Sequence, residues 1–224
     1  MAMTNTLTSS PTADVLSRLF AAAETQEAQE AAARPDQAPS APTREPTAQE
    51  RADSLQDVYM PVSRDGGRLL YALTRSTRPR TVVEFGTSFG ISTIHLAAAV
   101  IDNGAGRVFT TELSKAKVDQ ARANLSAAGV DGPVTVLTGD ARETLAGLPG
   151  PIGLVLLDGW KDLYLPVLHL LEPGLAPGAL VVADDSTFPS VAGYLAYVRD
   201  PAHGYVTVGF PVEDGMEISC WTGG

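Results

Sequence analysis

Short apolar runs alternate with segments of helical periodicity from residue 48 to the end of the chain. The runs are rich in Val, Leu and Ile and have the length of buried strands, whereas the segments between them repeat apolar residues every three or four positions. This alternation predicts an α/β fold in which helices cover both faces of a mainly parallel sheet. The expected strands are residues 81–85, 107–111, 134–137, 153–157, 179–183, 205–208 and 217–221. The expected helices are residues 64–76, 92–101, 114–128, 141–147, 163–171 and 191–198.

The first 47 residues have a different pattern. Residues 13–33 are rich in Ala, Glu and Gln, with Val15, Leu16, Leu19 and Phe20 as a short apolar face, and this favours an amphipathic helix. Prolines between residues 35 and 46 predict a linker over 34–47. We therefore divide the chain into an extension at 1–47 and a globular domain at 48–224. The extension is a solvated, partly flexible segment, a helix that packs on a partner subunit in a homodimer, or a lid over a binding site.

Composition limits the partners of this protein. The formal charge of −10 and the pI of about 4.7 argue against nucleic acid and against an anionic membrane. A small molecule is the expected substrate. Cys220 is the only cysteine, so neither an internal disulfide nor a cysteine-based zinc site can form. His95, His169 and His203 lack the spacing of metal ligands and are expected to be structural. Neither a signal-peptide pattern nor a membrane-spanning apolar run is present, and we expect a cytoplasmic protein.

Glycines follow the first expected strand, at the edge where parallel sheets bind ligands. The strand leads into Gly86 and Gly90, and the next helix begins near Ser92. Such a turn lets the backbone approach a ligand and offers free N–H groups to a carboxylate or phosphate. Ser88 stands where a dinucleotide fingerprint has its second glycine, so the turn favours a nucleotide-like cofactor other than NAD.

Acidic residues follow the second and third strands. Glu112 can accept hydrogen bonds from both hydroxyls of a ribose, and Asp140, followed by Ala141, can read an adenine edge. Taken singly, each acid is more often a solvated residue at a strand end. Because three consecutive strand ends carry compatible chemistry, we assign Glu112, Asp140 and Ala141 to cofactor binding.

Three carboxylates follow the fourth and fifth strands. Asp158 comes after the fourth strand, and Asp184 and Asp185 come after the fifth. Like charges that converge in a cleft require a cation, and hard oxygen ligands favour Mg²⁺, Mn²⁺ or Ca²⁺. We therefore predict a metal site at Asp158, Asp184 and Asp185. The alternative is that these residues cap neighbouring helices or loops.

From about residue 58 to residue 221 the sequence resembles the catechol O-methyltransferase family, which consists of cation-dependent, S-adenosylmethionine (SAM)-dependent O-methyltransferases of class I fold. The stretch LDGWKDLYLP at 157–166 is similar to the family's LDHWKDRYLP segment, and Ala183-Asp184-Asp185 is similar to its ADN. The resemblance implies a Rossmann-like sheet of seven strands, mostly parallel with an antiparallel last strand. It implies that residues 48–224 form a SAM-dependent methyltransferase domain. The implied reaction transfers a methyl group to a hydroxyl of a small, aromatic, catechol-like substrate with Mg²⁺, Mn²⁺ or Ca²⁺ bound.

The resemblance also implies roles for individual residues. Lys161 is the implied general base, provided that its pKa is depressed, and Trp160 the wall of a substrate slot that Lys161 also borders. Residues 60–62 match a loop that covers the methionine part of SAM, and Ser92 matches the contact to its carboxylate. The expected cofactor-binding residues are Met60, Val62, Glu84, Gly86, Ser92, Glu112, Asp140, Ala141 and Asp158. Without the resemblance, the sequence favours Lys161 as a solvated surface lysine paired with Asp162, and Trp160 is equally well explained as a packing residue.

Two positions depart from the family pattern, and other functions stay open. Asp185 stands where the animal enzymes have Asn, and Val208 aligns with a carboxylate that holds the second catechol hydroxyl, which bears on whether catechol is a substrate. The alternatives are a metal-independent SAM methyltransferase acting on a carboxylate or amine, a nicotinamide-dependent oxidoreductase, and a non-catalytic SAM-binding module.

Overall fold

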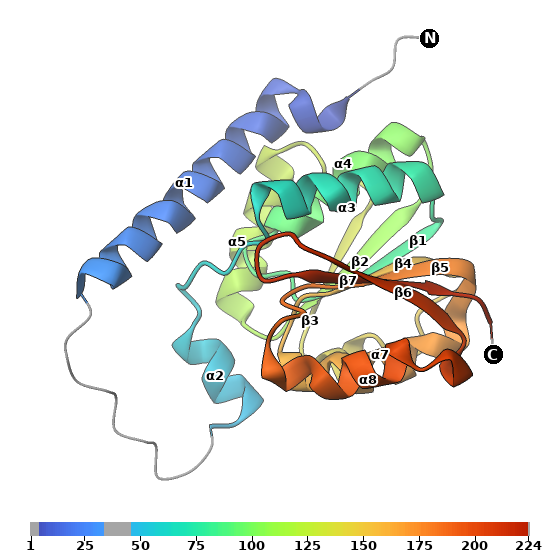
Figure 1. The fold of residues 1–224 in the computed structure, drawn as a ribbon. Helices are drawn as coiled ribbons and strands as arrows, with labels where there is room; N and C mark the ends of the chain where they lie inside the picture. Colours follow the sequence, from blue (N-terminus) through green and yellow to red (C-terminus); the bar gives the residue numbers. More distant parts are fainter. Residues whose placement is uncertain (1–4, 34–45, 224) are drawn as a thin grey trace.

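One seven-stranded sheet organises the part of the chain that the computed structural model describes, residues 5–33 and 46–223 (Figure 1). The strands are β1 (Thr81–Phe85), β2 (Arg107–Glu112), β3 (Val134–Thr138), β4 (Ile152–Leu157), β5 (Leu175–Ala183), β6 (Tyr205–Phe210) and β7 (Met216–Trp221). Their order is β3-β2-β1-β4-β5-β7-β6, and β7 runs antiparallel between β5 and β6. The predicted mostly parallel sheet with an antiparallel last strand is confirmed. The strand that differs most from its prediction is β5, which begins four residues earlier, in an irregular stretch around Pro177.

The register of the parallel strands brings their carboxyl ends to one level. Phe85 of β1 pairs with Leu157 of β4, and Leu157 pairs with Ala183 of β5. The residues that follow these three positions therefore lie side by side at one edge of the sheet. The strand order reverses between β1 and β4, and in such sheets this reversal is where ligands bind.

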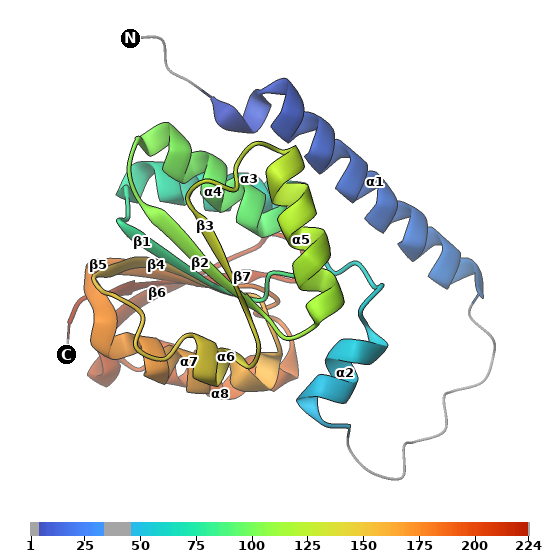
Figure 2. The ribbon, with the colours of Figure 1, turned by 180° about the vertical axis from the view of Figure 1, so that it is seen from behind.

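Helices cover both faces of the sheet (Figures 1 and 2). On one face lie α3 (Arg64–Thr77), α4 (Ile91–Asn103) and α5 (Lys115–Ala127), and on the other lie α6 (Ala141–Thr144), α7 (Tyr164–Leu171) and α8 (Ala192–Arg199). One-turn 3-10 helices occupy Thr6–Thr8, Lys161–Leu163, Glu172–Gly174, Pro189–Val191 and Pro201–His203. The predicted helices are thus found, although α6 ends three residues before its expected end. Within the described residues, no helix is long and apolar enough to cross a membrane.

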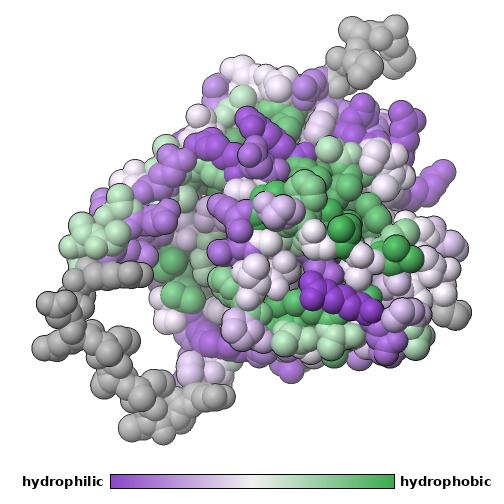
Figure 3. Space-filling view, viewed as in Figure 1, coloured by the Kyte–Doolittle hydropathy of each residue, from purple (hydrophilic) through white to green (hydrophobic). Residues whose placement is uncertain are grey.

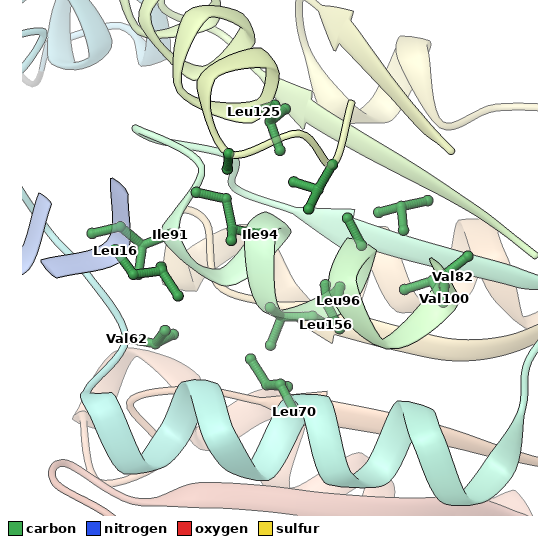
Figure 4. Close-up of a cluster of buried hydrophobic side chains, with 14 of the residues drawn as sticks. Leu16, Val62, Leu70, Val82, Ile91, Ile94, Leu96, Val100, Leu125 and Leu156 are labelled. Atoms are coloured by element: carbon green, nitrogen blue, oxygen red, sulfur yellow. The ribbon is translucent and has the colours of Figure 1, made fainter. Parts of the chain in front are cut away.

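Apolar side chains fill the space between the sheet and the helices on each face. Val82 and Val83 of β1 point to opposite faces because side chains alternate along a strand, and both are fully buried. Val82 belongs to a cluster with Leu70 of α3 and Ile94 of α4 (Figure 4). Val83 belongs to a second cluster, which packs under α7 and α8. Burial of a side chain of this kind contributes roughly 1.5–3 kcal/mol to stability.

The N-terminal helix α1 (Ser10–Ala33) lies along the outside of α4 and α5 (Figure 2). Leu16, Leu19 and Phe20 join the α4 cluster, and the Thr12 hydroxyl donates a hydrogen bond to the Ala128 carbonyl at 3.0 Å. Residues 24–33 are mostly exposed, and this end of α1 extends past the rest of the fold (Figure 1). The predicted amphipathic helix is confirmed, and its apolar face packs on its own chain. The expected linker over 34–47 lies almost wholly outside the described residues.

Helix α2 (Ala48–Ser54) is an element that the apolar pattern does not predict. It begins with a capping box, in which the Thr47 side chain accepts from the Glu50 N–H and the Glu50 carboxylate accepts from the Thr47 N–H. At its other end, the Arg51 guanidinium lies 4.8 Å from the ring centre of Trp160 and 3.5 Å from the Asp162 carboxylate. These contacts hold α2 beside the loop that follows β4.

Candidate active site

A cavity of about 510 Å³ opens at the carboxyl edge of the sheet, between α2 and the ends of β1 to β5. Ten of the predicted site residues line it: Met60, Gly86, Glu112, Asp140, Ala141, Asp158, Trp160, Lys161, Asp184 and Asp185. Val62 and Ser92 line a narrow recess that shares Met60, Gly86 and Asp158 with the cavity. Glu84 lies beneath both, within β1, and is fully buried. The structure therefore gathers the predicted residues into one continuous site.

The turn after β1 passes directly beside the end of β4. Gly86 has a φ of +105°, and a Cβ on it would collide with the backbone of Asp158. Gly86 is therefore required by the contact between two strand ends as well as by any ligand. Ser88 has a left-handed φ of 45°, which aims its backbone N–H at a Glu112 carboxylate oxygen 2.9 Å away.

The carboxylate of Glu112 is held from both sides by backbone N–H groups. One oxygen accepts from Ser88 and the other from Ser114, each at 2.9 Å. Each oxygen retains a second acceptor position, because a carboxylate offers about four lone-pair sites. Glu112 can thus accept two further hydroxyl donors, as a bound ribose would require.

Asp140 has a structural role that the sequence reading did not include. Its side chain caps α6 by accepting from the Arg142 N–H at 2.8 Å, and it forms an ion pair with the Arg142 guanidinium at 2.6 Å. These hydrogen bonds lower the pKa of Asp140 despite partial burial. The carboxylate lines the cavity but already accepts from the backbone and side chain of Arg142, so the backbone of Ala141, which also lines the cavity, is the better candidate to contact an adenine edge.

Three carboxylates and one lysine meet where β4 and β5 end. Lys161 Nζ lies 2.6 Å from the Asp185 carboxylate and 3.6 Å from that of Asp158, and it donates to the Tyr164 hydroxyl at 2.8 Å. The Tyr164 hydroxyl in turn donates to the Asp184 carbonyl at 3.2 Å. Burial and mutual repulsion raise the pKa of Asp158 well above its usual range and that of Asp184 to about 7. If all three carboxylates were ionised, they would carry more negative charge than Lys161 alone balances, and the raised pKa values reflect this cost.

The helix-capping alternative for these aspartates does not hold. Trp160 is the N-cap position of the 3-10 turn after β4, and Val191 is that of α8, so no aspartate of the cluster caps either element. Asp185 has a left-handed φ of 55°, a conformation that side chains other than Gly, Asn and Asp rarely adopt. The donor set of three oxygen-bearing carboxylates suits a hard divalent cation. Among the residues that the structure describes, however, no group of three such side chains is already arranged to hold a metal ion.

Comparisons with known proteins identify the family. Residues 83–186 match the model of a methyltransferase domain. The chain is 36% identical over 149 residues to a probable O-methyltransferase of Mycobacterium tuberculosis, a match covering 62% of this chain and 63% of that protein. It is 30% identical over 147 residues to the catechol O-methyltransferase of Sus scrofa, a match covering 62% of this chain and 78% of the pig enzyme. The chain belongs to the catechol O-methyltransferase family.

A solved structure supports the same assignment. The O-methyltransferase TomG from Streptomyces achromogenes, crystallised in complex with SAM, is 25% identical and superimposes with a TM-score of 0.64, covering 80% of this chain and 92% of TomG. The match to the mycobacterial relative spans just under two thirds of that protein's length. The comparisons thus show the family and the fold. Because the coverage of this relative is partial, the reaction of this chain is inferred from its own site.

Lys161 differs from the expected catechol O-methyltransferase base in one respect. It is mostly buried, with 18% of its side chain exposed, and Asp162 pairs with Arg51, so the surface-lysine alternative is wrong. Burial acts to lower the pKa of Lys161, but the charges of Asp158 and Asp185 outweigh it and raise the pKa above its usual value. The condition of a depressed pKa is therefore not met in the site without a cation, because two carboxylates stabilise the ammonium.

Val208 has no place in the cavity. It lies on the edge strand β6, and 58% of it is exposed. Val206 and Phe210 are exposed on the same strand. Hydrophobic patches interrupt the polar surface on the face seen in Figure 3. The carboxylates that border the cavity from this side are Glu213 and Asp214, in the turn between β6 and β7. They lie a few positions after Val208 along the chain, and a sequence comparison cannot align residues exactly across a turn whose length varies. Val208 therefore says nothing about catechols.

Several cavity residues were missed by the sequence reading. Lys117 in the first turn of α5 and Glu213 in a surface turn look like ordinary solvated charges, and Ala52 of α2 carries no chemistry. Lys117 could have been predicted from its position in the first turn of the helix that follows Glu112, because such a helix begins at the same edge of the sheet. His95 matches its expected structural role: it is buried and its ring nitrogen forms a hydrogen bond with the Ile91 carbonyl, and burial lowers its pKa to about 4.

Proposed function

We propose that this protein is a SAM-dependent O-methyltransferase that methylates a hydroxyl of a small, catechol-like aromatic substrate with the help of a divalent cation. The observation that carries the proposal is the cluster of Asp158, Asp184, Asp185 and Lys161 on the wall of a cavity whose other end holds Glu112. Family membership supports the methyl transfer, and the cluster supports the hydroxyl substrate, because both a cation and a base serve to generate an oxyanion.

The residues of the cavity fit SAM. Glu112 offers acceptors for ribose hydroxyls, and one carboxylate oxygen of buried Glu84 has no hydrogen-bond partner among the described residues, as expected of a site that awaits a donor. The recess lined by Val62 and Ser92 adjoins Glu84 and would receive the methionine part. The complex of TomG with SAM supports this cofactor for the family.

The acidic cluster fits Mg²⁺, Mn²⁺ or Ca²⁺ in donor chemistry. Asp158, Asp184 and Asp185 would hold the ion, which would lower the pKa of a coordinated hydroxyl. Lys161 lies within reach of the same point, and its hydrogen bond to Tyr164 fixes the direction of its ammonium. In the reaction, Lys161 as the free amine would accept the hydroxyl proton at Nζ.

The remaining wall suits an apolar, flat substrate. Trp160, Leu55 and Phe188 line the cavity near the acidic cluster, and Arg51 covers the outer side of Trp160. Methyl transfer from a sulfonium to an oxyanion removes charge, so an apolar wall that excludes water favours it. Glu213 and Asp214 are the carboxylates available to a second substrate hydroxyl.

Turnover should depend on a divalent cation. With SAM and a panel of catechols and monophenols, a chelator is expected to abolish methyl transfer, and added Mg²⁺ is expected to restore it. Asp158→Ala should not be rescued by Mg²⁺, whereas the control Asp119→Ala should behave as the wild type, because Asp119 is 57% exposed and pairs with Lys115 on α5. Full activity in the chelator would favour the metal-independent alternative acting on a carboxylate or amine.

A further inference from the structure

A buried lysine borders the cavity at the Glu112 end and takes no part in the chemistry proposed above. Lys117 is 3% exposed and lines the cavity. Its Nζ donates a hydrogen bond to the Ser88 hydroxyl at 3.3 Å and lies 5.3 Å from the centre of the Phe89 ring. The close ion pairs that Lys115 and Lys161 form have no counterpart at Lys117 within the described chain.

The surroundings of Lys117 disfavour an ammonium when no ligand is bound. An ammonium has three donors, and one long hydrogen bond to Ser88 occupies only one of them. Lys117 also lies in the first turn of α5, where the helix dipole repels positive charge. Burial lowers its pKa, although the more distant charges of Glu112 and Asp57 oppose this. The Phe89 ring and the Ser88 hydroxyl leave donors of the ammonium unused at the cavity wall, where a bound ligand could accept from them.

We propose that Lys117 is a cofactor-binding residue that donates to the ribose end of the cofactor and makes the site prefer S-adenosylhomocysteine (SAH) to SAM. This inference rests on the proposed function. Glu112 beside it offers only acceptors, and Lys117 adds the complementary donor. SAM carries a positive sulfonium that SAH lacks, so a fixed cation in the same cavity repels SAM more than SAH.

Calorimetric titration of the complete protein with SAH and with SAM tests this inference. Lys117→Met removes the charge and keeps the length of the side chain. It should weaken SAH binding about 10-fold, the effect of losing a hydrogen bond from a charged donor. SAM binding should weaken less, because repulsion is lost together with the hydrogen bond, so the preference for SAH falls. Lys115→Met is the matched control, since Lys115 is 79% exposed and pairs with Asp119.

The outcomes separate this inference from the function on which it rests. If the wild type binds neither ligand, the proposed function fails. If the wild type binds both and Lys117→Met binds SAH as tightly as the wild type, or loses SAM and SAH equally, the role of Lys117 is overturned. An equal effect of Lys115→Met would also overturn it. Thermal unfolding without ligand checks that the variant is folded, and Lys117→Gln replaces Lys117→Met if it is not.

Discussion

Asp185 combines two properties that bear on the acidic cluster. It holds a left-handed backbone conformation and forms the shortest ion pair of Lys161, at 2.6 Å. Asn, which stands here in the animal catechol enzymes, adopts the same backbone conformation readily, so Asp185→Asn removes a charge without disturbing the fold. We expect this variant to bind Mg²⁺ more weakly in a calorimetric titration, because one fewer negative carboxylate is left to balance the charge of the cation.

The control for this substitution is Asp162→Asn, which changes an exposed carboxylate in the neighbouring loop. Its Mg²⁺ affinity should equal that of the wild type. Unchanged affinity in Asp185→Asn would restrict the metal site to Asp158 and Asp184.

Lys161 is the residue whose loss should affect the rate most selectively. Lys161→Ala should lower kcat by about 10²-fold, within the range for a general base. SAH affinity should change little, because the lysine lies at the acidic end of the cavity, away from Glu112. Steady-state kinetics with SAH calorimetry measures both quantities, and Lys115→Ala serves as the exposed control. A rate equal to that of the wild type would leave Lys161 as a counter-ion for Asp158 and Asp185 only.

The chemistry at strand ends could be predicted from the sequence, whereas chemistry on helices and turns could not. Parallel pairing forces the residues after β1, β4 and β5 together, so Asp158 and Asp184 were placed without any knowledge of the loops. Lys117 and Glu213 reach the same cavity from a helix and a turn whose directions depend on packing. The raised pKa of Lys161 could not be predicted from the sequence for a related reason: the two carboxylates that raise it act through space.

At the scale of elements, α1 shows what periodicity can and cannot predict. The apolar face at Leu16, Leu19 and Phe20 predicts a helix, but the same face fits a partner subunit, a lid or the body of its own chain. The structure places it on the body. Helix α2 escaped prediction because it has no apolar repeat, and its one signal was the Thr47 and Glu50 capping box.

Packing of α1 should make it part of the cooperative fold. Leu19 is 1% exposed within the α4 cluster, so Leu19→Ala should lower the free energy of unfolding by about 2–5 kcal/mol. Gln29→Ala, on the exposed end of the same helix, should change it by less than about 0.5 kcal/mol. Denaturant unfolding followed by circular dichroism measures both. A small effect of Leu19→Ala would show that α1 unfolds independently of the sheet.

At the scale of the whole molecule, the sheet was the most predictable feature, because two buried faces demand apolar strands of a narrow length range. The protonation state of the carboxylates that the sheet buries could not be predicted from the sequence. Glu84 is fully buried in β1, and desolvation raises its pKa from 4.5 to about 7. The folded protein therefore holds a proton on Glu84 over a pH range in which the unfolded chain has released it.

This proton should make the ligand-free protein lose stability as pH rises from about 4.5 to about 7. The Glu84 contribution is at most about 3–4 kcal/mol, from 2.5 pKa units at roughly 1.36 kcal/mol each. Buried His95 acts in the opposite direction, because its lowered pKa makes the unfolded chain bind the extra proton between about pH 4 and 6.5. Asp158 and Asp184, whose pKa values are also raised, act in the same direction as Glu84. A pH profile of the wild type alone would therefore mix the effects of all these groups.

Comparison with Glu84→Gln isolates the carboxyl group, because the amide keeps the shape and cannot ionise. Urea unfolding in a chelator at pH 5 and pH 8 should show the wild type losing about 2–3 kcal/mol relative to the variant over this range. Glu30→Gln, on the exposed end of α1, should follow the wild type at both pH values. If the unfolding free energy changed equally with pH in the wild type and in Glu84→Gln, Glu84 would not take up a proton on folding. Its pKa in the folded protein would then be ordinary, and the raised value would be wrong.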